Sequence, residues 1–120
     1  MVETTLNTNM INNELKTVFY GSAVTIPYAA NITPVLTQGN VFKVTQTGNM
    51  VIDNPTIVNN GFYYLYVTLD GTGGYTLGFG DQWNLLGSGV YDNTANKVNI
   101  FSFMTFSGQA AIQYYINQRP

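Results

Sequence analysis

The sequence predicts an all-β protein, a single jelly-roll-like antiparallel β-sandwich of about eight strands preceded by an N-terminal arm. The first observation is that short apolar runs recur roughly every eight to twelve residues from Thr17 onward, with turn residues between them, a spacing typical of sandwiches and barrels. The second is composition: the chain is rich in Asn, Thr and Gly, which favour turns and strand faces over helix interiors. The 120 residues, 45% of them hydrophobic, suffice for one domain with one core.

The strands are predicted from apolar runs bounded by Gly, Pro, Asn and Asp. They cover residues 17–20, 23–27, 41–46, 50–52, 62–69, 75–79, 97–106 and 109–116. Residues 62–69 are apolar or aromatic at every position but Thr68, so we expect the central strand, covered on both faces. The glycine-rich segment 70–74 predicts a hairpin to residues 75–79, and Ser107-Gly108 predicts a second hairpin between the last two strands.

Residues 1–16 differ from the rest, and we assign them to an arm, leaving 17–120 for the sandwich domain. The apolar side chains of this segment fit no strand period; they are Leu6, Met10, Ile11 and Leu15. We expect these four residues to contact a capsid or a neighbouring subunit. The alternative is a frayed terminus without a partner.

Composition argues against most kinds of catalytic and metal-binding site. The chain has no His and no Cys, which removes the usual general base, the thiol nucleophile and the zinc clusters. The candidate acids all lie beside turn residues, where carboxylates ordinarily stabilise the turn; they are Asp53, Asp70, Asp81 and Asp92. We therefore expect no enzyme activity, no cofactor and no metal.

Charge and hydropathy argue against nucleic acid and membranes as partners. The four Lys and Arg residues are scattered along a chain of net charge −2, so we expect no nucleic-acid binding. No apolar run approaches the roughly 18 residues of a membrane-spanning helix, so we expect no membrane contact. Trp83, Tyr91 and Tyr115 could form an aromatic platform for a sugar, although packing in the core or between subunits is the stronger interpretation.

Several short motifs resemble a β-domain of tailed-phage virion proteins. They are Gly39-Asn40-Val41-Phe42, Gly48-Asn49-Met50-Val51-Ile52, Asn54-Pro55-Thr56, Asp70-Gly71-Thr72-Gly73-Gly74, Phe79-Gly80 and Asn99-Ile100-Phe101-Ser102-Phe103. The resemblance spans residues 30–117. It implies a structural role in the virion, as a head decoration or tail appendage protein, without catalysis.

Three functions of different classes follow. The leading expectation is a capsid decoration or cement protein that stabilises the head, because the chain shows no coiled coil or repeat typical of a fibre. The alternative is a tail or fibre module that binds a glycan of the host surface, and a hydrolase is a distant third. With few charges to protect strand edges, we expect a homotrimer that contacts the major capsid protein or other virion proteins.

Overall fold

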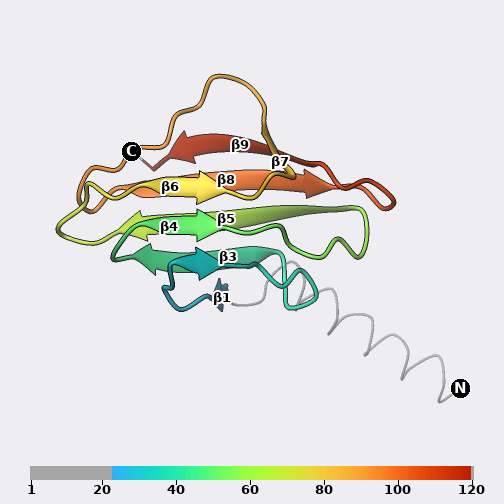
Figure 1. The fold of residues 1–120 in the computed structure, drawn as a ribbon, viewed down its shortest axis with the longest axis horizontal. Coiled ribbons are helices and arrows are strands. Elements are labelled where there is room, and N and C mark those ends of the chain that lie inside the picture. The colour runs from blue at the N-terminus through green and yellow to red at the C-terminus, as the bar shows by residue number, and fades with distance from the viewer. Residues whose placement is uncertain (1–22, 120) are drawn as a thin grey trace, which may run out of the picture.

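The computed structural model describes residues 23–119, which form nine strands and no helix (Figure 1). The larger sheet contains, in spatial order, β1 (Val24–Thr25), β3 (Val41–Gln46), β5 (Gly61–Leu69), β8 (Val98–Thr105), β9 (Ile112–Gln118) and β7 (Trp83–Leu85). The smaller sheet contains β2 (Asn31–Ile32), β4 (Met50–Ile52) and β6 (Leu77–Phe79). The expected all-β sandwich is confirmed, and β5 is a central strand of the larger sheet.

The first seven strands alternate between the two sheets, so the chain winds as a coil. Strands β1, β3 and β5 pair in parallel in the larger sheet, and β2, β4 and β6 do so in the smaller sheet. Phe42 of β3 lies opposite Leu65 of β5, and Ile52 of β4 lies opposite Phe79 of β6. Parallel neighbours need a long crossover connection, and here that connection runs through the other sheet. The expectation of an antiparallel, jelly-roll-like sandwich is therefore wrong for this half of the chain, and the larger sheet is mixed.

One of the two expected hairpins is wrong and the other is confirmed. The segment after β5 does not fold back along it, because β3 and β8 already occupy both edges of β5; the chain crosses instead to β6 in the smaller sheet. Strands β8 and β9 do pair antiparallel. Their link contains a turn closed by a hydrogen bond from Gln109 N–H to the Phe106 carbonyl at 3.1 Å, with Gly108 at φ 81°.

The core lies between the two sheets. Phe79 of the smaller sheet packs with its ring centroid 5.5 Å from that of Phe101 and 4.7 Å from that of Tyr114, both in the larger sheet. In β5 the alternate residues Tyr63 and Leu65 are buried, whereas Tyr64 between them is exposed. The expectation that β5 is covered on both faces is therefore wrong, because the smaller sheet covers one face only (Figure 1).

The expected arm, residues 1–16, and the expected strand at 17–20 lie outside the described residues. Within residues 23–119, no helix is long and apolar enough to cross a membrane.

Candidate binding surface on the outer face of the larger sheet

The outer face of the larger sheet carries a row of aromatic side chains. Because successive strand residues point to opposite faces, the residues that alternate with the buried core positions project outward. On β5 the exposed fractions are 69% for Phe62 and 46% for Tyr64, and on β9 the exposed fraction of Tyr115 is 43%. Three large rings thus lie on one face of two strands that flank β8.

A depression of about 230 Å³ lies between these rings, and we call it the aromatic trough. It is lined by Phe62, Tyr63, Tyr64, Ser102, Phe103, Met104 and Tyr115. The register explains it: Ser102 of β8 lies opposite Tyr64 of β5 on one side and opposite Tyr115 of β9 on the other. Two strand spacings separate the tyrosines by roughly 10 Å, and the small side chain between them leaves the space open.

A second depression, of about 220 Å³, lies further along β5, and we call it the basic depression. It is lined by Ala23, Val41, Lys43, Tyr66, Thr68, Val98 and Arg119. Lys43 of β3 lies opposite Tyr66 of β5, and the Arg119 guanidinium carbon lies 5.8 Å from the centre of the Tyr66 ring. Two cationic side chains therefore flank one aromatic ring.

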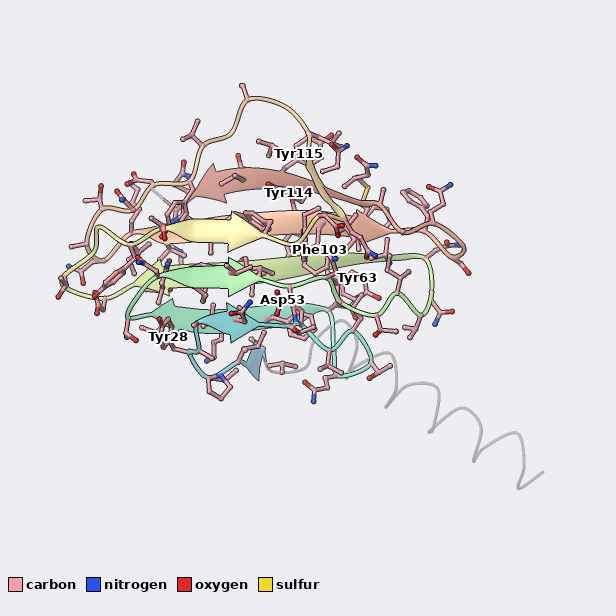
Figure 2. The ribbon with its side chains drawn as sticks, in the orientation of Figure 1. Tyr28, Asp53, Tyr63, Phe103, Tyr114 and Tyr115 are labelled. Atoms are coloured by element: carbon pink, nitrogen blue, oxygen red, sulfur yellow. The ribbon has the colours of Figure 1, made fainter. Side chains whose placement is uncertain are left out.

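The strands beneath this face are held by a dense aromatic core. Tyr63, Phe103 and Tyr114 come from β5, β8 and β9 (Figure 2). The rings of Tyr63 and Phe103 stack with centroids 5.2 Å apart, and Trp83 packs edge-on against Phe103 at 5.0 Å and against Tyr114 at 5.6 Å. A sheet packed in this way holds its outward side chains in fixed relative positions, as a binding surface requires.

A larger polar cleft, of about 460 Å³, lies where the loops after β4 and β6 meet the β8–β9 turn, and it includes Asn54 and Gln82. The Asn54 side chain donates to Asp81 at 2.8 Å and accepts from Gln82 N–H at 3.1 Å. A Cβ at Gly80 would lie 2.3 Å from the Asn54 side-chain oxygen. The Asn-Pro-Thr and Phe-Gly motifs therefore hold two loops together, and the Asn54 side chain already has hydrogen-bond partners.

Two of the four candidate acids, Asp70 and Asp92, stabilise turns as expected, whereas Asp53 and Asp81 accept hydrogen bonds from the side chains of Asn31 and Asn54. The Asp70 carboxylate accepts hydrogen bonds from Thr72 N–H at 2.9 Å, from Gly73 N–H at 3.1 Å and from the Tyr75 hydroxyl at 3.0 Å. The Gly73 hydrogen bond is the main reason that the pKa of Asp70 is lowered. Hydrogen bonds from Thr94 lower the pKa of Asp92 in the same way.

The structure separates the three aromatic residues suggested by the sequence. Trp83 is buried, and its indole N–H donates to the Asp53 carbonyl at 3.2 Å. Tyr91 is partly buried, and its hydroxyl donates to the Gln46 side chain at 2.5 Å. Tyr115 alone is on the outer face, so the three do not form one platform. The contact residues proposed for the arm, Leu6, Met10, Ile11 and Leu15, lie outside the described residues.

Sequence reasoning missed most of the outer-face residues. The available signal was the alternation in β5, where Phe62, Tyr64 and Tyr66 share one face. The register that places Ser102 between two tyrosines depends on pairing across three strands. Local sequence does not specify that pairing.

Comparison with known families identifies the domain. A family described as "Putative phage tail fibre C-terminal domain" matches residues 28–111, more than two thirds of the chain. The chain belongs to this family. No curated protein and no solved structure matched it. The tail fibre domain is thus a structural component of a phage virion, in line with the resemblance noted in its sequence.

The matched segment runs from the residues before β2 to those just before β9. Tyr64 and Ser102 of the aromatic trough lie inside it, whereas Tyr115 and Arg119 lie beyond it. The match favours a tail fibre over the head decoration that was the leading expectation from sequence.

Proposed function

We propose that this tail fibre domain binds a glycan on the surface of the host cell. The observation that carries the proposal is the set of exposed rings on the outer face, Phe62, Tyr64 and Tyr115. Exposed aromatic side chains gathered on one face are typical of interaction sites, since an isolated domain gains nothing from leaving them in water. Membership in a tail fibre family supports a position on the tail, where host contact occurs.

The chemistry of this face suits a sugar. A pyranose ring has an apolar C–H face that stacks on an aromatic ring, and hydroxyl edges that need hydrogen-bond partners. The tyrosines supply stacking faces with polar edges, while Ser102, Gln113 and Asn117 lie at neighbouring outward positions and offer hydroxyl and amide groups. A few polar groups placed among apolar rings is the common make-up of small-ligand sites.

The test is binding of the full chain to an immobilised array of bacterial surface glycans. We expect the wild-type chain to bind specific glycans on the array, and the Phe62→Ala/Tyr64→Ala double variant not to bind them. Val90→Ala is the matched control, because Val90 is 73% exposed but lies in the loop between β7 and β8. The proposal would be contradicted if the wild-type chain bound no glycan on the array, or if the double variant bound as well as the control.

Position in the virion is tested separately by electron microscopy with a gold-labelled antibody. Labelling of tails supports the tail fibre assignment, whereas labelling confined to heads would restore the decoration hypothesis.

We also propose that the chain forms a homotrimer and that this trimer contacts other virion proteins. Two short strands, β1 and β7, form the edges of the larger sheet, and Leu85 at the β7 edge is 40% exposed. An uncovered strand edge favours pairing with a neighbouring chain. Light scattering coupled to size exclusion should give three times the 13.2 kDa chain mass, and a stable monomer at micromolar concentration would refute this point.

A further inference from the structure

We propose that the glycan recognised by the outer face is acidic, with one sugar ring in the aromatic trough and the carboxylate of an adjoining uronic acid between Lys43 and Arg119. This inference rests on the proposed function and narrows it to a class of ligand. Three features carry it: the distribution of charge, the spacing of the two depressions, and the aromatic ring between the cations.

Charge is distributed unevenly over the molecule. The chain has a net charge of −2, yet two of its four cationic residues, Lys43 and Arg119, line one depression. A third, Lys97, has its ammonium group 3.8 Å from the Asp92 carboxylate, and this is the ion pair found within residues 23–119. No Asp or Glu lines either the aromatic trough or the basic depression. The two cations thus have no carboxylate beside them in the described part of the chain, and an anionic ligand would supply one.

The spacing of the two depressions matches neighbouring sugar units of one glycan. Tyr64 and Tyr66 are two residues apart on the same face of β5, which corresponds to roughly 7 Å along the strand. The aromatic trough is centred on the row of Tyr64 and Ser102, and the basic depression on the next row, which contains Tyr66 and Lys43. A ligand that fills both sites must therefore place a sugar ring and a charged group close together.

The ring between the cations distinguishes a uronic acid from a phosphate-linked polymer. Tyr66 lies opposite Lys43 and has the Arg119 guanidinium over its ring, so a sugar bound beside Tyr66 has both cations within reach. A uronic acid carries its carboxylate on the sugar ring itself. A phosphodiester places its charge between sugar units, away from the bound ring.

The same charges argue against a second copy of the chain as the occupant. A copy that docked through its own outer face would bring two more cations and no carboxylate from these depressions. Such a contact would bury like charges without compensation.

The experiment measures binding of the full chain to oligogalacturonate and, as the neutral comparison, to its methyl ester, by isothermal titration calorimetry. We expect the acid form to bind more tightly than the ester, and the difference to shrink as salt rises. Lys43→Gln/Arg119→Gln should weaken binding of the acid about two- to fivefold for each charge removed and leave the ester unchanged. Lys97→Gln, which removes the cation paired with Asp92, is the matched control and should change neither.

Ser102→Leu tests the aromatic trough, because it fills the space between Tyr64 and Tyr115 while keeping both rings. We expect it to abolish binding of acid and ester alike. Because Ser102 is on the outer face, thermal unfolding should occur near the wild-type temperature, which excludes misfolding as the cause.

The outcomes separate this inference from the proposed function. Equal binding of acid and ester, or an unchanged affinity of Lys43→Gln/Arg119→Gln for the acid, overturns the uronic acid assignment and leaves glycan binding intact. Binding of a glycerol phosphate polymer in place of oligogalacturonate overturns it in favour of phosphate. Dimerisation that is lost in Ser102→Leu would identify a second copy as the occupant and overturn it as well. Failure to bind any glycan on the array removes the proposed function and this inference together.

Discussion

Replacing Tyr91 by Phe should destabilise the fold without changing the binding surface. The Tyr91 hydroxyl donates to the Gln46 side-chain oxygen at 2.5 Å, and Gln46 has an exposed fraction of 0%. No buried side-chain nitrogen or oxygen in residues 23–119 lacks a hydrogen-bond partner. Tyr91→Phe would leave the Gln46 side-chain oxygen as the first such unpaired atom, because water does not reach it. Burial also raises the pKa of Tyr91, in keeping with a hydroxyl removed from water.

The expected cost follows from that unpaired oxygen. Leaving a buried acceptor without its donor costs about 1–3 kcal/mol, and complete burial of Gln46 places this case near 2 kcal/mol. For a domain of this size that loss corresponds to a decrease of roughly 8 °C in melting temperature. Urea denaturation of the wild type and the variant gives the difference in the free energy of unfolding directly.

The matched control is Tyr28→Phe. The Tyr28 hydroxyl donates to the Asn49 carbonyl at 2.8 Å, but Tyr28 is 37% exposed, so water can replace the lost donor. We expect a loss below about 0.5 kcal/mol. If the two variants lose equal stability, the assignment of Tyr91 to a buried polar network is wrong. Glycan binding should survive in both, since neither residue lines the outer-face depressions.

Two further predictions concern the turn after β5. Gly73→Ala should destabilise the fold by about 2 kcal/mol or more, because Gly73 has φ +65° and a Cβ there would lie 2.5 Å from the Ala95 nitrogen; Gly71→Ala, with no atom within 4 Å, should be nearly neutral in the same urea titration. The lowered pKa of Asp70 means that its carboxylate stabilises the fold above the ordinary pKa of 3.8, and that this contribution is lost as the pH falls through the lower pKa of the folded state. Asp70→Asn should therefore show a smaller loss of stability on acidification below pH 3.8 than the wild type, and parallel pH profiles would contradict this assignment.

Seven of the nine strands in residues 23–119 could be predicted from sequence because their pattern is local, whereas the short strands β2 and β7 were missed. The strand predicted at 97–106 contains β8, and the alternation of buried and outward residues in β8 places Phe101 and Phe103 in the core. The pairing of strands could not be predicted in the same way. The glycine-rich segment after β5 favours a hairpin locally, but the edges of β5 are occupied by β3 and β8, which come from distant parts of the chain.

The binding surface shows the same division between local and distant information. Tyr115 was suggested from sequence as part of an aromatic platform, and it does lie outside the core. Trp83 was suggested by its size and amphipathic ring, yet the parallel pairing of β7 with β9 buries it against Tyr114. Lys43 and Arg119 are 76 residues apart in sequence, and only the order β3, β5, β8, β9 brings both to the side of Tyr66.

Core and binding surface share the same strands, which separates their mutational effects. In β5 the residues Tyr63 and Leu65 pack inward, while Tyr64 and Tyr66 project from the opposite face. Substitutions at the inward positions remove buried area and should cost several kcal/mol of stability, whereas outward substitutions leave the core intact. A variant such as Ser102→Leu that loses binding and keeps its unfolding temperature therefore reports on the surface alone. A shift of β5 by one residue in its pairing register would exchange its inward and outward residues. The dense inner core therefore also fixes which rings face the ligand.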